Sequence, residues 1–157
     1  MSTVVNVAAF FAALLAMEAV AWAMHRYVMH GFLWSLHRSH HEPRAGWFEL
    51  NDLFGLVFAA IAIGGFWLGA QPGWTPLWWA AAGVTAYGVL YALVHDGLVH
   101  QRWPFRIPPK GRYLKRLYQA HRLHHAVATK DGAVSFGFLA PSDVRRLSAE
   151  LRARRSP

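Results

Sequence analysis

The chain has 157 residues, of which 55% are hydrophobic and only 15% are charged, with no cysteine and a formal net charge of +8. This composition is too apolar for an ordinary soluble domain and indicates a single domain with membrane spans. The lack of cysteine excludes thiolate zinc sites, iron–sulfur clusters and disulfides.

Three apolar runs are long enough to cross a membrane as helices. The first, about residues 1–24, precedes any Lys or Arg. A signal peptide would begin with basic residues, so we expect an uncleaved span. Residues 53–70 and 77–94 form the second and third runs, joined by the turn 71–76. A fourth span would require residues 1–24 to form a hairpin, and that run is too short for two crossings.

The basic residues predict how the chain is oriented. All sixteen Lys and Arg lie in residues 26–44 or 102–155, while the turn 71–76 carries no charge. By the positive-inside rule, we expect the segments 25–52 and 95–157 to be cytoplasmic and the N-terminus to be periplasmic. The predicted fold is an all-α integral membrane bundle with a helical cap on its cytoplasmic side.

Histidine is the residue type whose placement is most informative. The chain has ten, arranged as H-x4-H, H-x2-HH, H-x4-H and H-x2-HH. They are His25, His30, His37, His40, His41, His95, His100, His121, His124 and His125. Imidazole is the commonest protein ligand for transition metals, so two sets of five histidines predict a dinuclear metal site on one side of the membrane.

The spacing of these histidines constrains the helices that carry them. Residues at i, i+3 and i+4 share a helix face, so each H-x2-HH motif can point its imidazoles in one direction. Residues five apart lie about 140° apart on an ideal α-helix. The H-x4-H pairs therefore converge only if the helix ends, tightens or bulges there, which Gly31 and Gly97 would permit.

The donor set indicates which metals fit. Ten nitrogen ligands exceed what a structural zinc uses and suit two ions of higher coordination number. Iron fits best and copper second, although zinc can replace either in purified protein. Haem is a weaker alternative, because it needs single histidines on facing helices. A transporter is disfavoured because the second and third spans carry no polar groups at mid-membrane.

Three carboxylates are candidates for orienting the histidines. Glu18 lies seven residues before His25 on the same helix face, and a carboxylate within a span is a candidate functional residue. The alternative is a snorkelling or protonated side chain. Asp96 adjoins a histidine, and Asp52 precedes the second span.

The C-terminal third is predicted to be a cap. Residues 101–111 form a proline-rich connector, and residues 112–128 form an amphipathic helix that carries His121, His124 and His125. Ser142 can cap a final helix, which we expect to lie on anionic lipid headgroups rather than on nucleic acid.

The order of the histidine motifs resembles that of the fatty acid hydroxylase superfamily of membrane di-iron enzymes. Three further segments, HGFLWSLHRSHHEPR, FELNDLF and HRLHHAVATKDGAVSFGFL, are similar to the bacterial β-carotene 3-hydroxylases within it. This resemblance covers about residues 20–140. It implies an inner-membrane monooxygenase that uses O2, two non-haem irons held by the ten histidines, and electrons from ferredoxin or a similar donor.

The resemblance also implies the substrate. It predicts hydroxylation of β-carotene at C3 of each β-ionone ring, giving zeaxanthin through β-cryptoxanthin. Because an apolar pocket discriminates weakly against one added carbonyl, we also expect canthaxanthin to give astaxanthin. Three alternatives stay open: a related carotenoid ketolase, an acyl-lipid or sterol hydroxylase or desaturase, and a non-catalytic membrane metal or haem protein.

Overall fold

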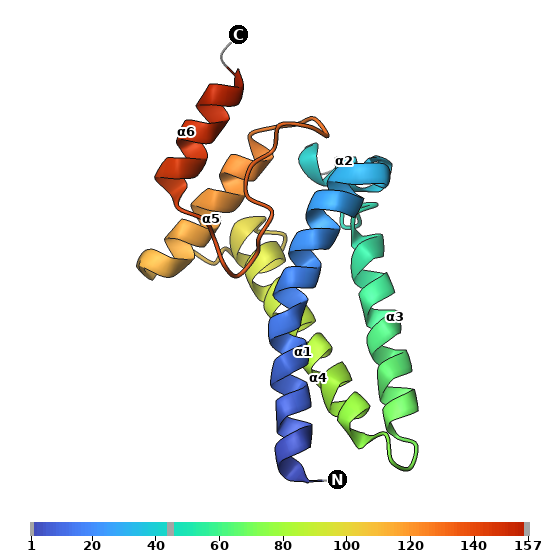
Figure 1. Ribbon diagram of the computed structural model, residues 1–157. Helices are drawn as coiled ribbons and strands as arrows, with labels where there is room; N and C mark the ends of the chain where they lie inside the picture. The colour runs from blue at the N-terminus through green and yellow to red at the C-terminus, as the bar shows by residue number, and fades with distance from the viewer. Residues whose placement is uncertain (1, 44–45, 156–157) are drawn as a thin grey trace.

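A computed structural model describes residues 2–43 and 46–155, and all regular secondary structure in those two ranges is helical (Figure 1). Arg44, one of the basic residues of segment 26–44, lies outside the described residues. The elements in chain order are α1 (Thr3–Ala23), η1 (Met24–Phe32), α2 (Trp34–His41), α3 (Asp52–Gly69), α4 (Thr75–Tyr91), η2 (Ala92–Val99), α5 (Gly111–His125) and α6 (Val144–Arg155).

Three continuous helical segments of the described chain are long and apolar enough to span a membrane, as the sequence predicted. They are Thr3–Phe32, Asp52–Gly69 and Thr75–Val99. Their outward faces carry large apolar side chains, such as Leu15 with 73% of its surface exposed and Ile63 with 68%. Such faces suit a lipid surround. The third span begins at Thr75, inside the predicted turn, because Pro76 fits the first helical turn, where its missing N–H costs nothing.

Small residues let the spans approach closely. A Cβ added to Gly83 of α4 would lie 2.3 Å from the carbonyl oxygen of Phe10 in α1. A Cβ added to Gly69 of α3 would lie 2.2 Å from the backbone nitrogen of Trp78 in α4. At both positions the added Cβ would collide with backbone atoms, which cannot move aside as a side chain can. The close packing of α4 against α1 and α3 therefore requires glycine at these positions.

Both H-x4-H motifs lie in π-helical segments. Met24–Phe32 extends α1 and Ala92–Val99 extends α4, and the Leu33 and His100 amides bond the carbonyls of Val28 and His95, five residues back. A π-helix places residues i and i+5 on one face, unlike an α-helix. The predicted departure from α-helical geometry is therefore confirmed at both motifs, and Gly31 has non-helical dihedral angles (φ −108°, ψ −123°).

The remaining helices form a cap at one end of the bundle. In Figure 1, α2, α5 and α6 lie at this end, whereas the N-terminus and the turn between α3 and α4 lie at the other. The histidine-bearing ends of α1 and α4 therefore meet α2 and α5 at the cap.

One prediction about the last helix is wrong. Its first turn is capped by Asp143, not Ser142, because the Asp143 carboxylate accepts from the amides of Arg145 and Arg146 at 3.0 Å. The apolar face of this helix packs within the protein, where Leu147 and Leu151 are buried against Ala120 of α5 and against Val134. Contact of its basic face with lipid headgroups stays a prediction.

Candidate metal centre

The cap brings all ten histidines into one continuous group of neighbouring rings. They come from η1, α2, the η2 segment with the His100 that follows it, and α5. Within this group, two sets of four place their ligand atoms within 4.8 Å of one another. We name them site A and site B. Site A consists of His25, His30, His37 and His124, and site B consists of His40, His95, His100 and His121.

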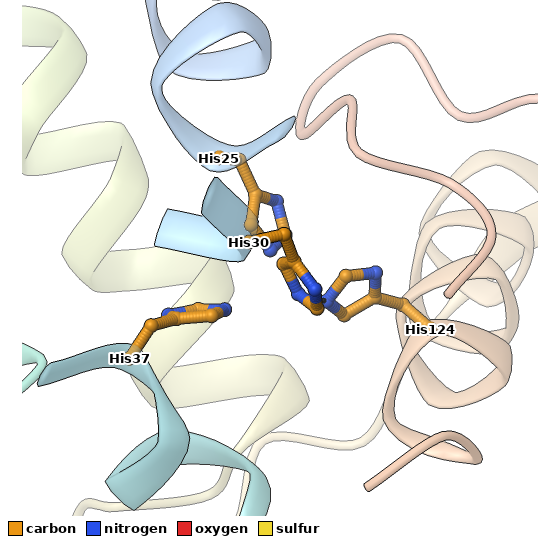
Figure 2. A group of neighbouring side chains, drawn as sticks. All are labelled: His25, His30, His37 and His124. Atoms are coloured by element: carbon orange, nitrogen blue, oxygen red, sulfur yellow. Dashed lines mark hydrogen bonds between the residues drawn. The ribbon is translucent and has the colours of Figure 1, made fainter. Parts of the chain in front are cut away.

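Site A is shown in Figure 2, where the four imidazoles point toward a common centre. His25 and His30 come from η1, His37 from α2 and His124 from α5. The rings of His25 and His30 lie 5.3 Å apart between centroids, so the π-helix does bring this i, i+5 pair together.

Site B is built in the same way around the other π-helix. The rings of His95 and His100 lie 4.4 Å apart between centroids. His40 comes to them from α2 and His121 from α5. The Nε2 atoms of His40 and His95 are 3.1 Å apart, and those of His100 and His121 are 2.9 Å apart.

The grouping of histidines differs from the division into chain halves that the motif repeat suggested. His124 of the second half joins three histidines of the first, and His40 of the first half joins three of the second. The cause is the position of α2 and α5, since each lies beside both π-helical ends and divides its H-x2-HH motif between the two sites. His41 and His125 stack on each other between the sites, with centroids 4.4 Å apart.

Backbone and side-chain acceptors determine the tautomer of seven of the histidines. In each, Nδ1 faces an oxygen that accepts a hydrogen bond, so Nδ1 carries the proton and Nε2 carries a lone pair. The pairs are His25 with Phe136 O, His30 with Lys130 O, His37 with Asn51 Oδ1, His40 with Glu49 Oε2, His41 with Val127 O, His95 with Asp96 Oδ1 and His124 with Val134 O.

These tautomers leave lone pairs facing one another inside both sites. His30 and His124 have their Nε2 atoms 3.1 Å apart although neither has a proton to donate there. In the part of the chain that the structure describes, His25 Nε2 is buried and has no hydrogen-bond partner. Facing lone pairs repel each other unless a cation lies between them. Two nitrogens bound at about 2.1 Å and at right angles to a metal lie about 3 Å apart, so the residues present fit a metal of octahedral preference.

Burial keeps the imidazoles of the cap neutral. It lowers the pKa of His37 to about 3, of His41 and His100 to about 4, and of His125 to about 2. Neighbouring imidazoles act in the same direction, because each would repel a second imidazolium. At neutral pH the lone pairs are therefore available for a metal, and no proton has to be displaced.

Among the hydrogen bonds of the described residues, Glu18 reaches no histidine, so the predicted direct contact with a ligand histidine is not found. Its carboxylate accepts hydrogen bonds from the Phe138, Leu139 and Ala140 amides at 2.8–3.0 Å and from the Tyr87 hydroxyl at 2.9 Å. It therefore anchors the segment that follows α5. That segment supplies the carbonyls of Val134 and Phe136 to His124 and His25, so Glu18 acts on site A through the backbone.

The two aspartates differ in their relation to the site. Asp96 accepts from His95 Nδ1 at 2.8 Å, which is the orienting role predicted for it. Asp52 contacts no histidine among the hydrogen bonds of the described residues. It receives both guanidinium nitrogens of Arg102 at 2.6 Å and caps the backbone amide of Glu49 at 2.9 Å. Asp52 therefore positions residues around site B.

Sequence reasoning missed two residues that orient histidines. Glu49 accepts from His40 Nδ1 at 3.0 Å, and Asn51 accepts from His37 Nδ1 at 2.7 Å. Both belong to FELNDLF, one of the three segments that carry the family resemblance. The position of these two polar residues, between the segment that holds three histidines and the next apolar span, was a usable signal, because polar side chains that enter the interior there need a partner.

A family model described as fatty acid hydroxylase matches residues 10–143. The chain belongs to the fatty acid hydroxylase family. It is 56% identical to a β-carotene hydroxylase of Pantoea ananas over 149 residues, which cover 95% of this chain and 85% of the relative. It is 57% identical to a β-carotene hydroxylase of Pseudescherichia vulneris over 140 residues, which cover 89% of this chain and 79% of the relative.

Plant relatives are more distant. A chloroplastic β-carotene 3-hydroxylase of Arabidopsis thaliana is 43% identical over 132 residues, which cover 80% of this chain and 41% of the relative. No solved structure matches the chain. Membership of this family and the two all-imidazole clusters together point to non-haem iron as the metal.

Proposed function

We propose that this chain is a membrane-bound carotenoid monooxygenase that hydroxylates C3 of β-ionone rings, converting β-carotene through β-cryptoxanthin to zeaxanthin. The observation that carries the proposal is the pair of all-imidazole sites at the end of three apolar spans, in a chain 56% identical to a β-carotene hydroxylase. A substrate dissolved in lipid and a metal centre at the end of the spans are then adjacent.

We infer that each of the two sites holds one iron. Site A would hold it through His25, His30, His37 and His124, and site B through His40, His95, His100 and His121, with His41 and His125 completing the two sets. Iron bound there supplies the activation of O2 that an unreactive ring C–H bond requires. For each hydroxyl group, one O2, two electrons and two protons give the alcohol and one water.

The protein's own residues prepare this chemistry. Oxygen acceptors hold the Nδ1 protons and direct the Nε2 lone pairs inward, which preorganises the ligand shell. Burial of His37, His40 and His124 excludes water from both sites. Two electrons per hydroxylation must come from outside the chain, and we propose a ferredoxin-type donor acting on the cytoplasmic side of the inner membrane.

Substrate selection should depend on shape, because a carotenoid ring offers no polar group for recognition. An apolar pocket rejects a small polar addition only weakly. We therefore propose that 4-keto rings are accepted within about a hundredfold of the parent ring. Canthaxanthin would then give astaxanthin.

Expression in a bacterial host that accumulates β-carotene, followed by pigment chromatography, tests the proposal. We expect β-cryptoxanthin early and zeaxanthin late, and none of either from a His124→Ala variant present at equal amount. A host that accumulates canthaxanthin should yield astaxanthin. Products oxygenated at C4 would indicate a ketolase instead. Hydroxylated or desaturated acyl lipid without a carotenoid product would show that the protein acts on acyl chains instead.

A further inference from the structure

The two sites differ in the groups that hold their histidines. In site A every acceptor of an Nδ1 proton is neutral. His25, His30 and His124 donate to backbone carbonyls, and His37 donates to the Asn51 amide oxygen. Site A thus receives no carboxylate through these four hydrogen bonds.

Site B is oriented by carboxylates. His40 Nδ1 donates to Glu49, whose side chain is only 9% exposed, at 3.0 Å. His95 Nδ1 donates to Asp96 at 2.8 Å. Two of the four site B histidines therefore carry an anionic partner on the nitrogen opposite the one available to a metal.

Further charged side chains lie around both sites. Near site B, Asp52 adds a third carboxylate, and the Arg102 guanidinium lies bidentate against Asp52 and 3.7 Å from Asp96. Near site A, the Arg26 guanidinium lies 5.1 Å from the ring centre of Phe136, which packs on His25 and His30, and the exposed Lys130 and Asp131 have opposite charges.

A carboxylate on the outer nitrogen makes an imidazole a stronger donor to a metal, and a buried negative charge favours a trivalent over a divalent ion. We propose that the two positions are chemically inequivalent: site B binds its iron more tightly and keeps it ferric to a lower potential than site A does. Glu49 is the main positioning residue of this asymmetry, because its side chain is the most buried of the three carboxylates. This inference rests on the two-iron assignment of the proposed function.

A charge series on the full-length, iron-loaded protein tests the inference. Glu49→Gln removes one carboxylate from site B and keeps an acceptor for His40. Asn51→Asp adds one carboxylate to site A and keeps an acceptor for His37. In the parent, site B has two more orienting carboxylates than site A. This difference falls to one in either single variant and to none in the double variant. Glu150→Gln is the matched control, because Glu150 pairs with Arg154 on the exposed face of α6.

The readout is a reductive titration with dithionite, which gives one electron to each ferric ion, followed by electron paramagnetic resonance of the half-reduced form. The wider the gap between the two midpoint potentials, the more of the half-reduced form accumulates, since each step of about 59 mV changes the comproportionation constant tenfold. We expect the gap to shrink by about 59 mV for each carboxylate step, equal to a tenfold change in equilibrium. It should be smallest in the double variant and unchanged in Glu150→Gln.

Iron release to a chelator provides a second readout. Glu49→Gln should release one of the two irons about 10- to 100-fold more readily and leave the other unaffected. An equal gap in all four proteins, or single variants that shift the gap in opposite directions, would overturn the inference. None of these measurements needs a carotenoid. If the variants shift the potential gap as expected but no carotenoid is converted, the substrate assignment is wrong and the difference between the two sites is still supported.

Discussion

His30 and His124, which are 94 residues apart in the chain, place their Nε2 atoms 3.1 Å apart while each donates its Nδ1 proton to a backbone carbonyl. Neither nitrogen can donate to the other, so this contact is one between two potential metal ligands. The pair also joins opposite halves of the chain within one site. The packing of the cap, rather than the sequence repeat, therefore decides which histidines lie together.

The grouping of histidines can be measured by metal content. If site A and site B each hold one iron, His30→Ala with His124→Ala should lose about one iron per protein, no more than either change alone, because both act on one site. His121→Ala with His124→Ala should lose about two, because these residues serve different sites. Iron analysis after desalting gives the count. The reverse pattern would show that the chain halves bind metal separately.

Glu18 should matter for stability and for site A. Glu18→Gln weakens the charge-assisted bonds from three backbone amides and from Tyr87, and such bonds contribute about 1.5–3 kcal/mol each. We expect a loss of about 2–3 kcal/mol in unfolding free energy. Iron loss from site A should accompany it, since the anchored segment carries Phe136 O and Val134 O. Melting and iron analysis in detergent measure both, and Glu150→Gln should change neither.

Gly83 should not tolerate even one added methyl group. Gly83→Ala would put a Cβ 2.3 Å from the Phe10 carbonyl oxygen, so α1 and α4 must separate. We expect a loss of about 1–3 kcal/mol or more, seen as a lower melting temperature. Gly88→Ala is the matched control in the same helix, because a Cβ there meets nothing within 4 Å. That variant should be neutral or slightly more stable.

Stability of the chelator-treated protein should fall with acidification. Burial lowers the pKa of His37 to about 3 and the pKa of His41 and of His100 to about 4, below the ordinary 6.5 of an unfolded chain. Below about pH 6.5 the unfolded chain therefore binds protons that the folded chain does not, and unfolding is favoured. Melting temperatures should drop from about pH 7.5 to about pH 5. A constant melting temperature would contradict the burial of neutral imidazoles.

The replacement of two of these titrating groups checks the cause of that pH dependence. His41→Gln combined with His125→Gln removes two imidazoles whose pKa burial lowers to about 4 and about 2. The fall in melting temperature over the same pH range should then be smaller than in the parent. An undiminished fall would assign the effect to other groups.

Membrane orientation can be tested with fusions. A cytoplasmic reporter should be active at the C-terminus, and a periplasmic reporter should be active in the turn 71–76. The expectation rests on the thirteen Lys and Arg in residues 102–155 and on the uncharged turn. The opposite pattern would place the histidine cap in the periplasm and exclude a cytoplasmic electron donor.

The sequence by itself determined the local features of this protein. Apolar length predicted the three spans, and the ten histidines predicted that metal chemistry would gather at one end. The i, i+5 spacing even predicted that the helices carrying His25, His30, His95 and His100 must depart from α-helical form, and both are π-helical. These features follow from periodicity and ligand chemistry within short stretches, which need no knowledge of the fold.

Only the tertiary structure decided which residues act together. His40 joins three histidines of the second chain half, and His124 joins three of the first, because α2 and α5 each lie beside both π-helical ends. Glu18 binds backbone amides 120 to 122 residues away, and Glu49 rather than Asp52 reaches a histidine. Partners at such separations depend on how helices pack, and packing depends on the summed contacts of the whole chain rather than on any one motif.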